Sequence, residues 1–454
     1  MRILVIGSGL AGVTSAYWLN RLGHEVTVIA REPSPATETS FANGSLLTPS
    51  MPEPWNAPGC WRVLLASLFR PDSPLKLRLA ALPSLLGWGI EFLRNSSPAR
   101  FERNTRSNIQ LALYSLELMH AIREATGIEY EQHSDGTQRP TGTQQPTGAQ
   151  RLTGAQQLTG AQQLTEAQRS EGPGALRLFR ETKSWDEASR VAAGREGVQF
   201  KRLSVSETLA LEPALAPLAP KLAGSIHYPG DECGDAHRFC VALADHARQA
   251  GVRFRFSTEI AAIEVQSGQV KAVLAQEQRF IADHYVIAAG SFSTPLLAKI
   301  GIKLPVRPAK GYSVTFDDVP ASQRLRTPVL DDALHAVVVP LGNAIRAAGT
   351  AEFAGFDLSL PEPRVLNLVN LARQILPEAN LDASRAKAWC GLRPMSADGV
   401  PIIGPTPLSN VWVNTGQGPL GWTMAAGSAH LLTELICAQP TKIDPAPYAL
   451  NRFG

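Results

Sequence analysis

The sequence has few cysteines, almost no excess charge and no long apolar run. Its 454 residues include 43 basic and 40 acidic side chains, which gives a formal net charge of only +3. This balance argues against a nucleic-acid partner, because nucleic-acid binding needs a basic footprint. The five cysteines are scattered, odd in number and never arranged as Cys-x-x-Cys. We therefore expect no disulfide scaffold and no zinc site, and the sequence favours a reducing compartment, the cytoplasm.

No stretch of the chain is apolar over the roughly 20 residues that a membrane-spanning helix needs. The best candidate, residues 79–90, is shorter and contains Pro83. Residues 60–101 nonetheless mix leucines, phenylalanines and tryptophans with arginines and few acids. Two interpretations stay open for this segment: amphipathic helices that pack on their own domain, or peripheral contact with the inner face of the plasma membrane.

The N-terminus carries the pattern of a β-α-β unit. Residues 3–6 are typical of a buried parallel strand, residues 11–22 have a helical pattern, and residues 25–30 predict a second strand. Between strand and helix stands the fingerprint Gly-Ser-Gly-Leu-Ala-Gly, which favours a tight turn, close approach to a pyrophosphate and close helix packing. This context predicts dinucleotide binding. The expected contacts there are Gly7, Gly9, Leu10, Ala11 and Gly12.

One element of that fingerprint is missing. An acid about 20 residues further on usually binds the ribose hydroxyls, and Ala30 occupies its place here. Arg31 and Glu32 follow directly. Glu32 is the candidate substitute for the missing acid, and looser binding of the ribose is the alternative.

Residues 135–170 repeat a six-residue unit of the form Thr-Gly-Ala-Gln-Gln-Leu. They lie between the strand-like segments 128–132 and 175–180, so they would extend the tip of a hairpin. Three interpretations stay open: a flexible surface loop, a short β-solenoid stack, or a module for self-association. None of them places catalysis in the repeat.

Several further motifs follow in order along the chain. They occupy residues 39–45, 209–215, 229–235, 310–313, 391–394, 398–404 and 415–423. Together with the N-terminal fingerprint, they resemble the D-amino-acid dehydrogenase small-subunit group of the DAO-type FAD-dependent oxidoreductases, over nearly the whole chain except the repeat. The resemblance implies FAD as cofactor and oxidation of a D-amino acid, by hydride transfer to flavin N5, to an imine that hydrolyses to a 2-oxo acid and ammonia. It also implies that electrons pass to a quinone or another non-oxygen acceptor.

The fold that this implies is α/β: a Rossmann-like FAD-binding domain with an interwoven α+β substrate-binding domain. We place the FAD-binding domain at residues 1–55, 196–220, 236–303 and 391–454. The substrate-binding domain takes residues 56–195, 221–235 and 304–390, with the repeat at 135–170 inserted in it. Within these ranges the sequence predicts a hairpin over 259–274, strands at 336–340 and 344–349, and a helix near 362–376.

The resemblance also assigns roles in the substrate site. Arg393 would bind the substrate carboxylate, because a planar fork of donors matches two oxygens. Tyr228 and Tyr312 are candidates to hydrogen-bond the carboxylate or to line the pocket. His227 is expected to face away from Tyr228 on its strand.

Further cofactor contacts are expected in four other segments. Backbone near Asn43, Gly44 and Ser45 would contact the flavin ring, and the turn before the helix at 422–437 would stabilise charge on the flavin N1–C2=O edge. Gln417 and Pro419 depart from the family, which usually has His and Thr there. The remaining predicted contacts are Arg31, Glu32, Ala289, Gly290, Gly391, Gly416, Gly418, Leu420, Gly421, Trp422 and Thr423.

Alternatives to a D-amino-acid dehydrogenase stay open. A cyclic imino acid dehydrogenase or an amine oxidase of the same family would share every motif. A nicotinamide-dependent dehydrogenase would share the glycine fingerprint. A flavin-fold subunit that uses the repeat for assembly would need no catalysis. The nine histidines are dispersed, so no metal site is expected.

Overall fold

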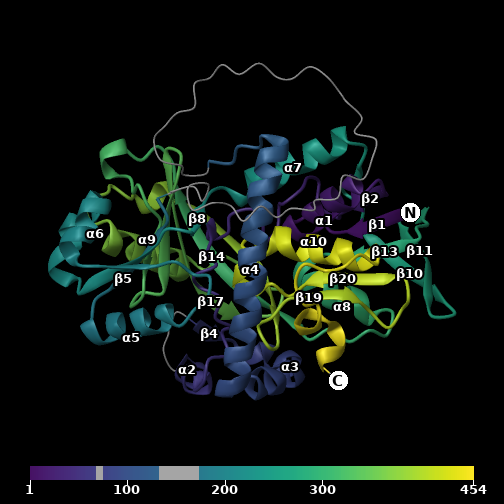
Figure 1. The fold of residues 1–454 in the computed structure, drawn as a ribbon, viewed down its shortest axis with the longest axis horizontal. Coiled ribbons are helices and arrows are strands. Elements are labelled where there is room, and N and C mark those ends of the chain that lie inside the picture. Colours follow the sequence, from purple (N-terminus) through teal and green to yellow (C-terminus); the bar gives the residue numbers. More distant parts are fainter. Residues whose placement is uncertain (68–74, 132–172, 454) are drawn as a thin grey trace.

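The computed structural model describes residues 1–67, 75–131 and 173–453. The hexapeptide repeat at 135–170 lies outside the described residues, as does part of the segment 60–101. Within the described ranges the chain forms two large sheets and two small ones. In Figure 1 the six-stranded sheet lies to the right, the nine-stranded sheet to the left, and helix α4 runs between them.

The six-stranded sheet has the order β19-β20-β13-β1-β2-β9. All neighbours are parallel except β19, which is antiparallel to β20. Apart from the edge strand β9, which is largely exposed, the strands are mostly apolar and buried, as a parallel sheet requires. Their bounds are β1 (Arg2–Ile6), β2 (Glu25–Ile29), β9 (Arg253–Arg255), β13 (His284–Ile287), β19 (Ile402–Pro405) and β20 (Val411–Thr415).

Helices cover one face of this sheet and a small sheet covers the other. Helices α1 (Leu10–Arg21) and α10 (Ala425–Ile436) pack their apolar residues on the first face, and α7 (Ala236–Gln249) packs on α1. The opposite face contacts the antiparallel sheet of β10 (Ile260–Gln266), β11 (Gln269–Ala275) and β12 (Gln278–Phe280). The hairpin expected over 259–274 is confirmed, but its strands form this separate sheet.

The nine-stranded sheet has the order β18-β14-β17-β16-β15-β5-β7-β6, with β4 paired to β17. The strands predicted at 336–340 and 344–349 and the helix near 362–376 are confirmed. Helix α9 (Glu362–Ile375) packs on one face of the sheet. The bounds are β4 (Leu75–Leu77), β5 (Ala175–Phe179), β6 (Lys201–Leu203), β7 (Gly224–Tyr228), β14 (Val306–Phe316), β15 (Val329–Asp331), β16 (Ala336–Leu341), β17 (Ala344–Phe353) and β18 (Lys387–Ser396).

Strand β17 contains a bulge at Thr350. Its neighbour β14 pairs Tyr312 with Gly349 and Gly311 with Ala351, so Thr350 is the extra residue. Its φ of +53° is rare for a β-branched side chain. Because one residue is inserted, the alternation of side chains along β17 restarts after the bulge.

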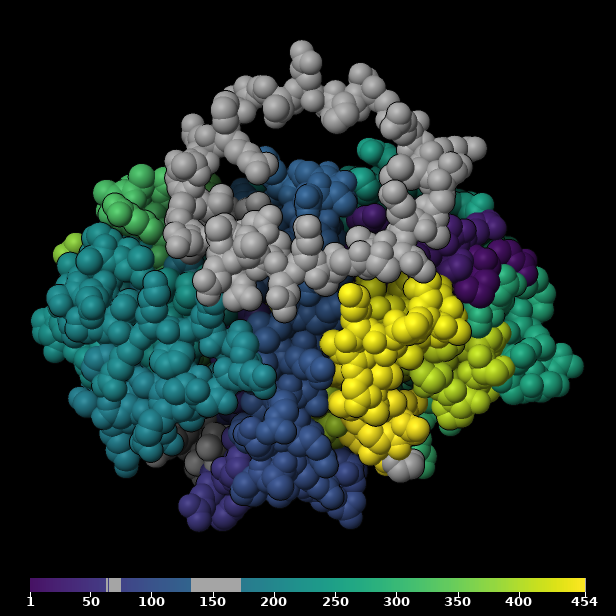
Figure 2. Space-filling view, in the orientation of Figure 1, coloured from purple at the N-terminus to yellow at the C-terminus, as the bar shows by residue number. Residues whose placement is uncertain are grey.

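The remaining elements connect or flank the two large sheets. Helix α4 packs on α10, and Figure 2 shows its surface between the teal segments near residues 175–230 and the yellow C-terminal segment. No helix in the described ranges has the length and apolarity to cross a membrane. The bounds are α2 (Cys60–Ser67), α3 (Leu82–Arg94), α4 (Pro98–Thr126), α5 (Thr182–Ala193), α6 (Val205–Leu211), α8 (Ser293–Ala298), β3 (Leu46–Leu47) and β8 (Glu232–Cys233).

The structure corrects three expected boundaries. Residues 196–220 carry β6 and α6, which pair with or pack on β7 of the nine-stranded sheet and not with the six-stranded one. Residues 391–396 complete β18 of the same sheet. Helix α4, expected in the substrate domain, buries its apolar face against α10. The strand expected at 128–132 is also absent from its described residues, 128–131.

Candidate active site

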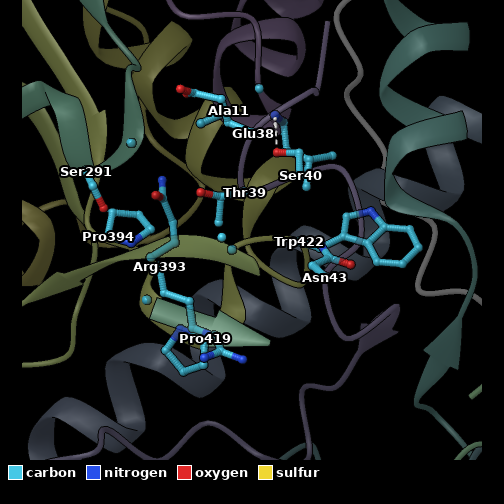
Figure 3. A pocket seen from close by; sticks show the side chains of 18 of the residues that line it. Ala11, Glu38, Thr39, Ser40, Asn43, Ser291, Arg393, Pro394, Pro419 and Trp422 are labelled. Atoms are coloured by element: carbon cyan, nitrogen blue, oxygen red, sulfur yellow. Dashed lines mark hydrogen bonds between the residues drawn. The ribbon is translucent and has the colours of Figure 1, made fainter. Parts of the chain in front are cut away.

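A cavity of about 900 Å³ lies between the two large sheets. One wall consists of the carboxyl ends of β1, β2 and β13, and the other consists of β14, β17 and β18. Its volume is at the upper end of the roughly 300–1,000 Å³ that small-molecule and cofactor sites occupy. Figure 3 shows side chains from both walls that point into it.

The glycine turn after β1 is a backbone cradle. Gly7 has a φ of +111°, and a Cβ there would lie 2.4 Å from the carbonyl oxygen of Ala288. A Cβ on Gly12 would lie 1.9 Å from the carbonyl oxygen of Gly7. The Leu10 amide at the start of α1 donates to Ser40 Oγ (3.2 Å), a contact drawn in Figure 3. The turn and the helix N-terminus therefore fit a diphosphate, which only side-chain-free backbone can approach so closely.

The carboxyl end of β2 places charged groups beside this cradle. Arg31 and Glu32 line the cavity, and Arg31 lies 3.1 Å from Glu32 and pairs with Glu38. The Arg31 guanidinium also stacks over the Phe292 ring, 3.7 Å from its centroid. Burial raises the pKa of Glu38, and Arg31 opposes that shift. Sequence reasoning missed Glu38, because no motif marks an acid in this loop.

The segment 43–45 is fixed by its own hydrogen bonds. Asn43 Oδ1 accepts the Ser45 amide (3.0 Å), and Ser45 has a φ of +58°. The Ser45 hydroxyl accepts from Arg346 on β17 (2.8 Å). Asn43 and Trp422 line the same part of the cavity (Figure 3). The backbone of this segment is therefore held rigidly at the wall where the resemblance expects the flavin.

Most of the expected cofactor contacts line the cavity, but three do not. Those on its wall are Gly7, Gly9, Leu10, Ala11, Arg31, Glu32, Asn43, Gly44, Ser45, Ala289, Gly290, Gly391, Gly418, Leu420, Gly421 and Trp422. Gly12 packs behind the turn against Gly7. Gly416 lies behind the wall near Ser396, and the Thr423 hydroxyl accepts the Thr48 amide (3.0 Å). These three act on the cavity only through the backbone that they hold.

Arg393 extends from β18 into the cavity on the side of Pro419 (Figure 3). Its guanidinium makes one long hydrogen bond, from Nη1 to the carbonyl oxygen of Thr350 (3.5 Å), and lies over the Trp55 ring. Within the described chain, no carboxylate forms an ion pair with it. Burial lowers its pKa to about 10, which still leaves it charged at neutral pH. The cavity therefore contains a cation whose donors are free to bind an anion.

Tyr312 on β14 also lines the cavity, but its hydroxyl is engaged with another residue. It belongs to the core beneath α9, with Val314 and Leu368. Its hydroxyl donates to Glu352 Oε2 (2.5 Å). Its neighbour Ser313 faces the opposite way and donates to the Ala42 carbonyl, as strand alternation requires. The hydroxyl is therefore already paired, and a contact of Tyr312 with the substrate carboxylate stays a prediction.

Tyr228, in contrast, does not line the cavity. It packs with Phe179, Ala192 and Ile226 beneath α5. Burial raises the pKa of its phenol, and the Arg177 guanidinium opposes the shift. His227 does face away from it, because its Nε2 lies 2.8 Å from the Pro173 carbonyl. The sequence could not show that α5 covers this face of β7.

The cavity combines a glycine cradle on a parallel sheet with a guanidinium, Arg393, that has no carboxylate partner in the described chain. This combination is typical of an enzyme that binds a dinucleotide cofactor and a substrate with an anionic group. Residues 2–435 match the family model DAO, FAD dependent oxidoreductase, and the chain belongs to this family. FAD is therefore its cofactor, and the cradle has the shape to hold the diphosphate. In the described ranges, no group of His, Cys, Asp and Glu could hold a metal ion.

Relatives and solved structures extend this result. The chain is 37% identical over 458 residues to a D-amino acid dehydrogenase of Agrobacterium fabrum, and the alignment covers all of both chains. Its fold is similar to that of glycine oxidase from Geobacillus kaustophilus (TM-score 0.70, 23% identity, 99% of each chain). It is also similar to L-proline dehydrogenase from P. horikoshii (TM-score 0.71, 18% identity, 100% of this chain and 97% of that one).

Proposed function

We propose that this protein is a D-amino acid dehydrogenase. It oxidises a D-amino acid to the imine, which water hydrolyses to a 2-oxo acid and ammonia, and it passes the electrons to a quinone or another non-oxygen acceptor. The observation that carries the proposal is Arg393, a charged guanidinium on the wall of the cavity with no carboxylate partner in the described chain. The relatives named D-amino acid dehydrogenase, aligned over their full length, support the choice of substrate.

The residues of the chain bind and orient the substrate. Arg393 binds the carboxylate through two donors, which fixes two atoms of the substrate and so the direction of its Cα–H bond. Trp55, Leu75 and Ala351 line the cavity with apolar surface and exclude water, which strengthens the ion pair. Bound FAD supplies the two-electron acceptor for this oxidation.

A substrate panel tests the proposal. Purified protein with its flavin is mixed with D- and L-amino acids and with D-proline and hydroxyproline, and reduction of an artificial dye is followed. We expect dye reduction with one or more acyclic D-amino acids and little with their L-enantiomers. Preference for the cyclic substrates would identify an imino acid dehydrogenase. No reduction with any of them would reject the proposal.

The same panel tests the electron acceptor. Turnover is measured as oxygen consumption and as reduction of a soluble quinone. We expect quinone reduction to be the faster of the two. Oxygen consumption at the faster rate would indicate an oxidase.

We also propose that the protein docks on an anionic membrane through helix α3. The inner face of α3 packs Leu85, Trp88 and Phe92 in a core. Its outer face is also apolar: Leu86 is 66% exposed and Ile90 is 54% exposed. Because amphipathic helices on soluble surfaces carry polar outer faces, this face is unusual.

Positive charge beside this face favours a lipid surface as its partner. Leu79 precedes α3 and is 68% exposed, and Trp61 of the neighbouring α2 is half exposed beneath Arg62. Arg94, the last residue of α3, is exposed and paired with Glu91, and Arg100 beyond the helix is also exposed. Apolar side chains flanked by arginines match the interface of an anionic bilayer, where the apolar groups enter and the cations meet lipid phosphate.

Vesicle binding tests this docking. The double variant Leu86→Glu/Ile90→Glu is mixed with phosphatidylglycerol vesicles, and bound protein is measured by flotation. We expect at least a tenfold loss of binding, because each buried leucine or isoleucine contributes about 1.5–3 kcal/mol. Leu366→Glu, an exposed apolar residue on α9, is the matched control and should bind as the wild type does. Equal binding by both variants would reject α3 as the docking face.

A further inference from the structure

The Arg393 guanidinium lies directly on the backbone of Gly311. In the sheet, β18 pairs antiparallel with β14, with Arg393 opposite Ala309 and Gly391 opposite Gly311. Arg393 and Gly311 are therefore diagonal neighbours on the same face. A Cβ built on Gly311 would lie 2.0 Å from Nη1, 2.2 Å from Cζ and 2.5 Å from Nη2 of Arg393. The planar group thus covers the exact space that any side chain at 311 would need.

The bulge in β17 bounds the other side of the guanidinium. The Thr350 carbonyl accepts the long hydrogen bond from Nη1, and Ala351 beside it presents only a methyl group. The guanidinium is therefore bounded by the Gly311 backbone on one side and by the Thr350 carbonyl on another. Arg393, Gly311, Thr350 and Ala351 all line the cavity, so a ligand in it can reach the other donors of the guanidinium.

Gly311 does not need to be glycine for its own conformation. Its φ is not in the left-handed region, so an alanine could adopt the same backbone. It lies inside a strand, where glycine weakens the sheet relative to residues with side chains. What the position requires is space above the strand, and the three heavy atoms nearest to that space all belong to Arg393.

We infer that Gly311 is a positioning residue: it lets the Arg393 guanidinium lie flat on β14, with the fork of donors presented to the substrate carboxylate. The inference rests on the proposed function for the identity of that carboxylate. A methyl group at 311 would not disturb backbone, because the atoms it meets end a flexible side chain. It would instead lift the guanidinium by more than an ångström, and a displacement of this size can cost about 100-fold in rate.

The variant Gly311→Ala tests this directly. We expect kcat/KM for the best substrate to fall about 100-fold. We expect the Kd for benzoate, a simple carboxylate measured by calorimetry, to rise at least tenfold by the same displacement. The flavin absorbance spectrum and Tm should stay as in the wild type, which separates displacement of Arg393 from damage to the fold. Gly230→Ala, at an exposed turn with open space, is the matched control and should be unchanged.

A double-mutant cycle shows whether the effect passes through Arg393. In an Arg393→Ala background there is no guanidinium to displace, so adding Gly311→Ala should change kcat/KM less than about twofold. If Gly311→Ala alone does not fold, the double variant should fold, because the clash is removed. A full second loss in the double variant, or benzoate binding unchanged in Gly311→Ala, would overturn the inference.

The benzoate measurement also separates this inference from the proposed function. Benzoate binding needs no turnover. If the wild type binds benzoate and Gly311→Ala does not, but no D-amino acid is oxidised, the proposed function fails and the positioning role stands. If D-amino acids are oxidised equally by both proteins, the positioning role fails and the function stands.

Discussion

The two walls of the cavity use glycine for different purposes. The wall formed by β1, β2 and β13 is called the dinucleotide wall below. Here Gly7 and Gly12 allow backbone to approach backbone, because Cβ atoms at these positions would meet the carbonyl groups of Ala288 and Gly7. The opposite wall, formed by β14, β17 and β18, is called the substrate wall below after its proposed role. Here Gly311 makes room for a side chain, Arg393. Backbone cannot move without moving the sheet, whereas an arginine can rotate. The first wall is therefore rigid and tolerates no side chain at Gly7 or Gly12, whereas the second can be altered without loss of the fold.

The largest expected effect is that of Gly12→Ala. Its Cβ would lie 1.9 Å from a backbone oxygen, so either α1 or the turn must shift. Overpacking typically costs about 1–3 kcal/mol and more where backbone must move. We expect purified Gly12→Ala to lose most of its FAD, measured by absorbance after denaturation, together with a lower Tm.

Gly9→Ala sharpens this prediction within the same turn. Its Cβ would meet only the hydroxyl oxygen of Ser40, at 3.3 Å, and that side chain can rotate. We expect a smaller loss of FAD than in Gly12→Ala. Equal loss in the two variants would show that the close backbone contact at Gly12 is not what limits substitution.

The next effect in size is that of Arg393→Ala on the substrate wall. Removing one partner of a buried, hydrogen-bonded charge pair costs about 2–5 kcal/mol, or roughly 30- to several-thousand-fold in kcat/KM. We expect this loss in steady-state kinetics with normal FAD content, in contrast to Gly12→Ala. The kcat/KM of Arg393→Lys should lie between those of the wild type and Arg393→Ala, because lysine keeps the positive charge and loses the two parallel donors of the guanidinium. An unchanged kcat/KM in Arg393→Ala would remove the basis of the proposed function.

The difference between the walls also explains which features the sequence could predict. The dinucleotide wall comes mainly from one local unit, β1–turn–α1–β2, although β13 and Ala288 join it from far along the chain. The fingerprint therefore predicted the strands and the helix of this unit and most of its residues that line the cavity. Local pattern also predicted the hairpin at 259–274 and helix α9.

The substrate wall depends on the register of strands far apart in the chain. Arg393 was predicted because the motif at residues 391–394 resembles that of a known family. Its contacts with Gly311 and Thr350 depend on how β14, β17 and β18 pair, which the sequence does not show. The bulge at Thr350 leaves no local signal that we recognised. The positions of Tyr228 and Tyr312 could not be predicted for the same reason. Which face of a strand is covered by α5 or α9 depends on tertiary packing, not on local sequence. Packing, not propensity, also moved residues 196–220 to the second sheet.

A smaller effect concerns Asp231, which joins the N-terminal segment to the turn after β7. It is buried, and Ser50 donates to it through its hydroxyl (2.5 Å) and its amide (3.3 Å). Burial raises its pKa to about 7. A carboxyl with a folded pKa above its unfolded value favours folding at low pH, and this contribution is lost as pH rises from about 4 to 7.

The variant Asp231→Asn removes that titration and keeps the hydrogen bond from the Ser50 amide to Oδ1, while its Nδ2 can donate to the Ser50 hydroxyl in place of the second bond. We expect its Tm to change less between pH 5 and pH 8 than that of the wild type, by a few degrees, and to be the higher of the two at pH 8. Thermal unfolding followed by flavin fluorescence at the two pH values measures this. A wild-type pH dependence that the variant leaves unchanged would assign the titration to other groups.

The smallest effect on catalysis is expected for Tyr312→Phe, which tests whether the two faces of β14 are separate. The hydroxyl donates to Glu352, which also accepts from Arg78 (2.6 Å), and neither of these two residues lines the cavity although Tyr312 does. Without the hydroxyl, one oxygen of Glu352 loses a buried donor, at a cost of about 1–3 kcal/mol in the free energy of unfolding. KM should change less than about twofold, because truncation of a hydroxyl that is engaged with Glu352 removes no contact to the substrate. Urea unfolding and steady-state kinetics on one preparation measure the two quantities. A large rise in KM with unchanged stability would show that the Tyr312 hydroxyl acts in the substrate site and that the two faces of β14 are not separate.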